Sequence, residues 1–165
     1  MTTMTQAGAT TQVYQVYIKA TAQAIWDAIT RPEWAQRYGY AAPVEYDLRP
    51  GGAFRGLTSN EMKQHGAPDV ILDGEVLEAD PPRRLVQTWR VLWDPALAAE
   101  GFTRLTWEID EGPPGISKLT VTHELERAPR VAAQVSGAIR EAGGGWSWVL
   151  SDLKSLLETG KSMAT

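Results

Sequence analysis

The sequence predicts an α+β fold in which a curved, seven-stranded antiparallel sheet wraps around one long C-terminal helix. Residues 143–157 carry apolar side chains at the spacing of one helix face: Trp146, Val149, Leu150, Leu153 and Leu157. Before residue 129 the chain consists instead of short strand-like segments separated by turn residues. Because one helix cannot bury its apolar face alone, the sheet is its expected partner.

Two short helices are expected after the first strand. Residues 12–19 are rich in β-branched and aromatic side chains, which predicts that strand. Thr21 is a good N-cap for the first helix. Pro32 suits the start of the second helix, which would place Trp34 and Tyr38 on one side.

The remaining strands form hairpins in sequence order. Proline and glycine mark their turns, because proline fixes φ and glycine allows conformations closed to other residues. The hairpins pair residues 43–49 with 53–58, 69–79 with 83–93, and 102–110 with 117–125. Residues 59–69 and the segment around Asp94 lack an apolar period and are expected to be loops.

Length and composition predict one domain over residues 12–160, with a disordered polar tail at 1–11 and a short C-terminal tail at 161–165. The first residues lack the basic and apolar regions of a secretory signal, and no apolar run is long enough for stable membrane insertion. A cytoplasmic location is therefore expected. The absence of cysteine excludes disulfides, thiolate metal sites and a cysteine nucleophile.

Charge and motif content argue against several partners. The net charge of −4 is spread along the chain without a basic stripe, so nucleic acid is not an expected partner. No paired histidine or acid motif lies on a helix, and Gly143 to Gly145 lack the lysine of a phosphate loop. We therefore expect no metal and no cofactor.

Aromatic side chains are the candidate binding residues. Seven tryptophans are present, and strand alternation places several of them on the face toward the helix. The expected ligand-binding set is Trp34, Tyr38, Tyr40, Tyr46, Phe54, Gln87, Trp89, Trp107, His123, Trp146, Val149 and Leu153. The alternative is that these rings simply fill the space between helix and sheet.

Two residues on the inward face, His123 and Gln87, are polar. His123 lies between apolar neighbours, where it is either a hydrogen-bonded core residue, which we favour, or a general base. Gln87 shares its face with Trp89 and suits an orienting group in an apolar pocket. No catalytic constellation is found, so no catalytic residue is predicted.

The segments DLRPGGAFR, GEVLEADPPRRLVQTW and GWSWVLSDLKSLLE resemble the C-terminal domain of the activator of Hsp90 ATPase homologue, in the START-like (SRPBCC, Bet v 1-type) superfamily. The resemblance covers about residues 12–160 and implies a helix-grip fold with a cavity between sheet and C-terminal helix. Relatives often carry a paired Trp-Trp where this chain reads Arg37-Tyr38-Gly39-Tyr40, which changes the rings expected at the mouth.

Three functions follow as hypotheses. The first is a binding protein for an apolar or amphipathic small molecule such as a lipid, a polyketide or an aromatic compound. The second is an enzyme of the cyclase, dehydratase or hydrolase type, in which His123 or a tyrosine transfers protons. The third is a stress-response interaction module that binds a chaperone of the Hsp90 type. A homodimer is a further partner to test.

Overall fold

The computed structural model describes residues 10–139 and 143–164. Most of the expected tail at residues 1–11 lies outside these ranges, and Thr11 already belongs to the first strand. In the described residues, seven strands form one antiparallel sheet in the order β1-β7-β6-β5-β4-β3-β2. They are β1 Thr11–Ile18, β2 Val44–Tyr46, β3 Ala53–Leu57, β4 Val70–Asp80, β5 Arg84–Val91, β6 Thr103–Glu111 and β7 Ser117–Glu124.

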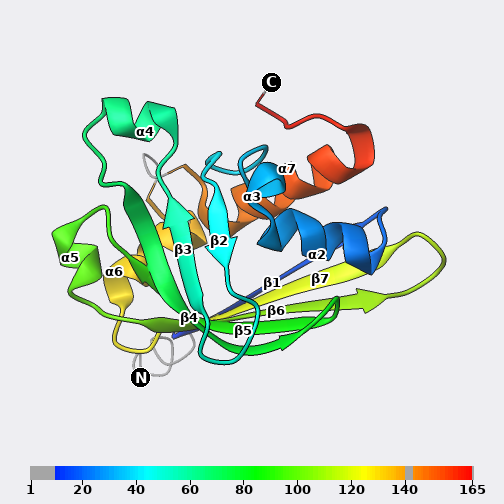
Figure 1. Ribbon diagram of the computed structural model, residues 1–165, viewed down its shortest axis with the longest axis horizontal. Helices are drawn as coiled ribbons and strands as arrows, with labels where there is room; N and C mark the ends of the chain where they lie inside the picture. The colour runs from blue at the N-terminus through cyan, green and yellow to red at the C-terminus, as the bar shows by residue number, and fades with distance from the viewer. Residues whose placement is uncertain (1–9, 140–142, 165) are drawn as a thin grey trace.

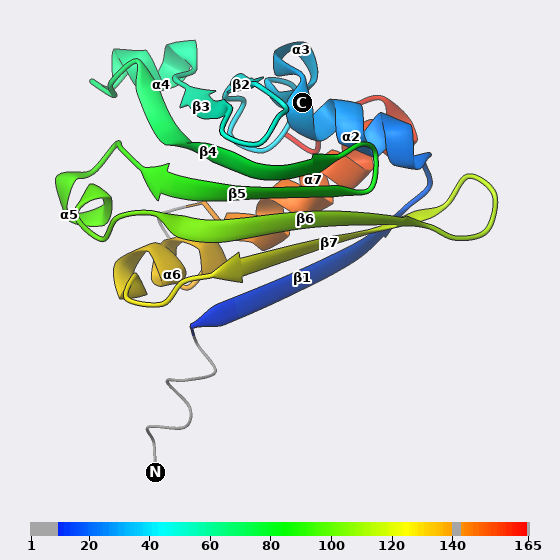
Figure 2. The ribbon, with the colours of Figure 1, turned by 60° about the horizontal axis from the view of Figure 1, so that its bottom comes forward.

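The helices lie around this sheet, and the long last helix lies across its concave side (Figures 1 and 2). They are α2 Ala22–Thr30, α3 Pro32–Ala35, α4 Asn60–Gln64, α5 Pro95–Ala98, α6 Pro129–Ser136 and α7 Gly145–Thr159. Helices α2 and α3 follow β1 as expected, and Thr21 Oγ1 caps α2 by accepting from Ala24 N at 3.1 Å. The predicted fold class is confirmed.

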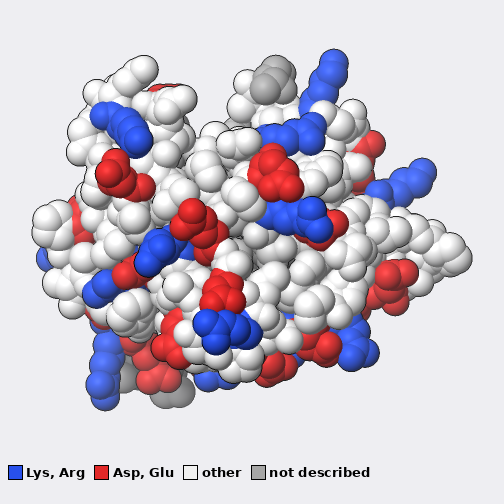
Figure 3. Space-filling view, in the orientation of Figure 1, with Lys and Arg blue, Asp and Glu red and all other residues white. Residues whose placement is uncertain are grey.

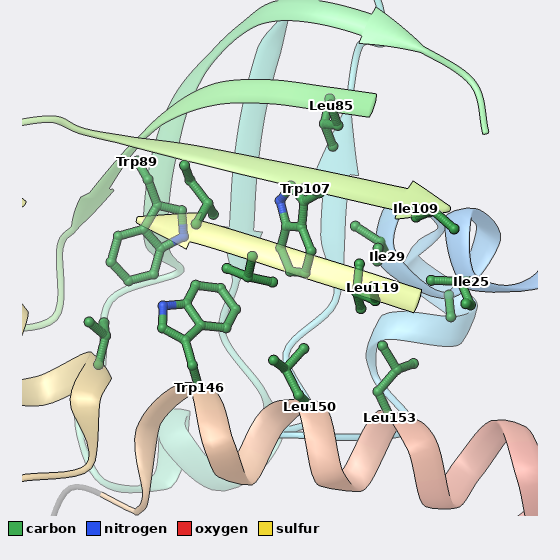
Figure 4. Packing of buried hydrophobic residues seen from close by; sticks show 14 of the residues in the cluster. Ile25, Ile29, Leu85, Trp89, Trp107, Ile109, Leu119, Trp146, Leu150 and Leu153 are labelled. Atoms are coloured by element: carbon green, nitrogen blue, oxygen red, sulfur yellow. The ribbon is translucent and has the colours of Figure 1, made fainter. Parts of the chain in front are cut away.

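The apolar face of α7 forms one side of the core. Trp146, Leu150 and Leu153 point from α7 toward side chains of the sheet and of α2 (Figure 4). Leu156 is buried with them, whereas Leu157 is only half-buried. The helical stripe is therefore confirmed with a shift of one residue at its C-terminal end.

The free edge of β1 is covered by polar groups of α7. Lys154 Nζ donates to the Tyr17 carbonyl oxygen at 2.6 Å, and Lys19 N donates to Glu158 Oε2 at 2.8 Å. The same Lys154 and Glu158 side chains pair with each other at 2.8 Å. These contacts occupy backbone groups that an open sheet edge would offer to another strand.

Short helices replace the loops expected around residues 59–69 and Asp94. Helix α4 is capped by Ser59 Oγ, which accepts from Met62 N, and α5 is capped by Asp94 Oδ1, which accepts from Ala96 N. Helix α6 was not predicted. Helix α3 ends at Ala35, so the expected pairing of Tyr38 with Trp34 on one helix is wrong.

The sheet surface and its surroundings carry mixed charge. Basic and acidic side chains are interspersed over the face shown in Figure 3. On the sheet, Arg90 pairs with Asp73 at 2.7 Å and Arg84 with Glu108 at 2.6 Å. Within residues 10–139 and 143–164, none of the helices has the length and apolar character needed to cross a membrane.

The turn between β2 and β3 depends on its two glycines. Gly51 has a φ of 87°, a conformation that is costly for residues with a side chain. At Gly52 a Cβ atom would lie 2.0 Å from the Asp47 carbonyl oxygen, which is far closer than atoms can approach.

We expect Gly51→Val and Gly52→Val each to lower the free energy of unfolding by roughly 1 to 3 kcal/mol. Urea denaturation would measure both. Ala53→Val is the matched control, because this exposed residue opens β3 and valine suits a strand. Unchanged stability in both glycine variants would contradict the described turn.

Candidate ligand cavity

A cavity of about 680 Å³ lies between the concave side of the sheet and α7. Ligand sites for small molecules typically measure about 300 to 1,000 Å³, so this space is large enough for one. Many of the residues expected from the sequence line it: Tyr38, Tyr40, Tyr46, Phe54, Trp89, Trp107, Trp146 and Val149. Their role in ligand binding stays a prediction.

The other expected residues do not line the cavity. Gln87, His123 and Leu153 have 0% of their surface exposed and do not line the cavity. Trp34 is half-buried against the core, with the Arg37 guanidinium 4.7 Å from its ring centre. These side chains can affect a ligand only through the residues that they support.

Tryptophan rings from the sheet and from α7 that line the cavity pack together (Figure 4). The rings of Trp107 and Trp146 meet edge to face, with centroids 5.3 Å apart. Trp89 lies 6.3 Å from Trp146, and the Tyr46 and Phe54 centroids are 4.7 Å apart. Such aromatic pairs hold each other in defined orientations, so this wall is apolar and rigid.

Gln87 fixes two of the lining rings from behind. Its Oε1 accepts from the Tyr46 hydroxyl at 2.7 Å and from Trp107 Nε1 at 3.1 Å. Burial raises the pKa of Tyr46, so its hydroxyl remains protonated and donates. Gln87 thus orients lining side chains, and its predicted contact with a ligand is replaced by contacts with Tyr46 and Trp107.

His123 holds the Trp146 ring in the same way. Trp146 Nε1 donates to His123 Nδ1 at 3.1 Å, so the proton of the neutral ring lies on Nε2. Nε2 is 2.8 Å from Thr103 Oγ1, which in turn donates to the Trp89 carbonyl oxygen at 3.0 Å. Burial lowers the pKa of His123 to about 3, and the imidazole is therefore neutral at physiological pH.

The loop after α3 forms another part of the wall. The Tyr38 hydroxyl donates to the Ala28 carbonyl oxygen at 2.9 Å, and Gly145 N donates to the Tyr40 hydroxyl at 3.1 Å. Burial raises the pKa of Tyr38, and the charge of nearby Asp152 raises it further. The phenol groups on this side are thus held as neutral hydroxyls by structural contacts.

Several residues at the rim of the cavity were not predicted from the sequence. Helix α4 has no buried residue, yet it lies over the opening and contributes Glu61, Met62 and His65. Residues from β4, α6 and the end of β5 complete the lining, among them Leu72, Gln134, Val135 and Trp93. Met62 and His65 are three residues apart, and recognition of the Ser59 cap could have indicated a helix with both on one side.

The arrangement favours binding over proton transfer. The Tyr38, Tyr46, Trp107 and Trp146 donors bond to the backbone or to Gln87 and His123, so aromatic rings and aliphatic groups make up most of the cavity surface. Among the described residues no three His, Cys, Asp or Glu side chains lie close enough together to hold a metal ion.

A curved antiparallel sheet that grips a long C-terminal helix defines the helix-grip fold of START-like proteins. The chain matches the model of the family described as Activator of Hsp90 ATPase homolog 1-like protein over residues 19–158, and it belongs to that family. No curated protein matches the chain.

Solved structures share the fold at low sequence identity. Protein MLL2253 from Mesorhizobium loti is 20% identical with a TM-score of 0.67, and the match covers 90% of this chain and 96% of that one. The Aha1 dimer from Colwellia psychrerythraea is 15% identical with a TM-score of 0.61, covering 92% and 98%. DynU16, a putative protein in the dynemicin biosynthetic locus, is 20% identical with a TM-score of 0.62; the match covers 93% of this chain and 49% of DynU16.

Proposed function

We propose that this protein binds an apolar or amphipathic small molecule in the cavity between the sheet and α7. The observation that carries the proposal is a space of about 680 Å³ walled largely by aromatic rings, in which Trp107 Nε1 and Trp146 Nε1 already bond to Gln87 and His123. Apolar surface that leaves water for such a wall gains roughly 25 cal/mol per Å². The location of the related DynU16 in a biosynthetic locus is compatible with a small-molecule ligand.

The enzyme and the chaperone-binding module predicted as alternatives have less support. His123, the candidate base, is separated from the cavity and bonded on both ring nitrogens. The chaperone hypothesis depends on the family name alone. A homodimer is proposed by analogy with the Colwellia relative, and light scattering would test it.

A ligand should quench or shift the tryptophan fluorescence, because Trp89, Trp107 and Trp146 line the cavity. We expect at least one member of a panel of fatty acids, flavonoids and polyketide-like aromatics to do so and to raise the melting temperature. Val149→Phe should weaken that binding about tenfold or more, since the added ring occupies space that the ligand needs.

Ser151→Phe is the matched control, because Ser151 is an exposed residue of the same helix. Circular dichroism must show that both variants fold, as overpacking costs about 1 to 3 kcal/mol. Equal loss of affinity in the two variants, or no response to any compound, would argue against the cavity as the binding site.

A further inference from the structure

The charges at the cavity are of one sign. Among the described residues that line it, Glu61 is the one acidic side chain, and no lysine or arginine contributes to the wall. His65 and Gln134 supply the other polar side chains at the rim. Within residues 10–139 and 143–164, the charged side chain that a ligand in this cavity meets is therefore a carboxylate.

Nearby cations are held away from the cavity by other partners. Lys63 follows Glu61 by two residues on α4, but its Nζ lies 3.8 Å from Asp69 Oδ1. The Arg37 guanidinium lies over the outer ring of Trp34. Neither side chain lines the cavity, so neither is placed to neutralise an anionic ligand there.

A second carboxylate lies directly behind the wall. Asp152 of α7 is 1% exposed, and its Oδ2 accepts from Gly39 N, a lining residue, at 2.9 Å. Every described contact of Asp152 is with a donor, including Ser162 Oγ at 2.9 Å and Met163 N at 2.6 Å, as an ionised carboxylate requires. Its charge adds to the negative potential on this side.

The aromatic rings of the cavity also favour a cationic ligand. The face of an indole or phenol ring carries partial negative charge and attracts cations, with tryptophan the most effective. Trp89, Trp107 and Trp146 all contribute surface to the cavity. The overall net charge of −4 also favours the approach of cations over that of anions.

We propose that the cavity selects apolar molecules that carry a protonated amine over carboxylates of the same shape, with the amine placed at the rim beside Glu61. This selectivity rests on the proposed binding function and narrows its ligand class. Fatty acids and other anionic amphiphiles would lose their hydration without gaining a basic partner, which is costly for a charged group.

Three compounds with the same anthracene body would test the proposal by isothermal titration calorimetry near neutral pH: 9-anthracenemethylamine, 9-anthracenemethanol and 9-anthracenecarboxylate. We expect the amine to bind about threefold more tightly than the alcohol, and the carboxylate about tenfold more weakly than the amine, as a rim ion pair is partly screened by water. Glu61→Gln should remove the advantage of the amine and leave the alcohol unchanged.

Glu45→Gln is the control of equal charge change, because Glu45 is exposed on β2 and does not line the cavity. It should preserve the order of the three affinities. Binding of the carboxylate as tightly as the amine would overturn the selectivity and leave the binding function standing. If none of the three bound or raised the melting temperature, both proposals would be contradicted.

Discussion

Lowering the pH from about 7 to about 4.5 should cost this protein roughly 2 to 3 kcal/mol of folding free energy through His123 alone. The pKa of His123 is lowered from 6.5 to about 3 by burial. Below pH 6.5 the His123 imidazole takes up a proton in the unfolded chain, whereas in the folded protein it stays neutral. The stability that the neutral ring contributes is therefore present above pH 6.5 and is lost progressively as the pH falls toward 3.

The two histidines of the chain give a matched comparison. Urea denaturation at both pH values would be measured for the parent protein, His123→Gln and His65→Gln. His123→Gln should be less stable at neutral pH but should lose this part of the acid sensitivity. His65→Gln should keep it, because His65 is exposed on the rim. An identical pH response of all three proteins would contradict the neutral buried imidazole.

The acid response has a structural consequence for the cavity. Protonation of Nδ1 would remove the acceptor for Trp146 Nε1, and a charged imidazole would lie in the core against Trp89. Both effects disturb rings that line the cavity. Because the folded ring stays neutral until the pH approaches 3, ligand binding should persist between pH 7 and 4.5 for as long as the protein stays folded, which fluorescence titration over the same pH range would test.

The strands and the long helix could be predicted because their patterns extend over many residues. Alternation in β6 and β7 specifies one inward face, and the structure buries Leu105, Trp107, Leu119 and Val121 as expected. Helices α4 and α5 have only a few residues each, too short for an apolar period to show. The N-cap residues Ser59 and Asp94 were the sequence features that could have predicted these two helices.

The candidate site could be predicted only in part, because alternation gives the direction of a side chain and not its depth. Trp107 and His123 both point inward, but Trp107 borders the cavity and His123 lies behind Trp146. The curvature of the sheet sets that difference, and a local pattern does not encode it. Helix α4 reaches the cavity through tertiary arrangement, so Glu61 and Met62 carried no signal as rim residues.

Asp152 is the clearest case of tertiary structure overriding a sequence pattern. On α7 it lies outside the apolar stripe, as Ser151 and Lys154 do, and helical periodicity favours an exposed side chain there. The residues after α7 instead fold back over it, and Ser162 Oγ and Met163 N donate to its carboxylate. Helical periodicity cannot anticipate such a cover, because it comes from a segment beyond the helix.

Asp152→Ala should lower the free energy of unfolding by about 2 to 4 kcal/mol. The substitution leaves Gly39 N–H and Met163 N–H without their acceptor. Both bonds are partly buried, and a fully buried donor left unpaired costs about 1 to 3 kcal/mol. The saving from no longer burying a charge offsets part of this loss. Urea denaturation would measure the loss of stability. Ser162→Ala should lower the free energy of unfolding by only about 1 kcal/mol, because it removes one donor and leaves the backbone contacts of Asp152 in place.

Glu158→Ala is the control on the same helix. Glu158 also accepts from a backbone N–H and pairs with Lys154, but its side chain lies at the surface, where such contacts contribute about 1 kcal/mol or less. Because Asp152 bonds to Gly39 of the cavity wall, its loss should also weaken ligand binding, whereas Glu158→Ala should not. Equal, small losses of stability in the two variants, with ligand affinity unchanged, would show that Asp152 does not hold the wall and the C-terminal residues together.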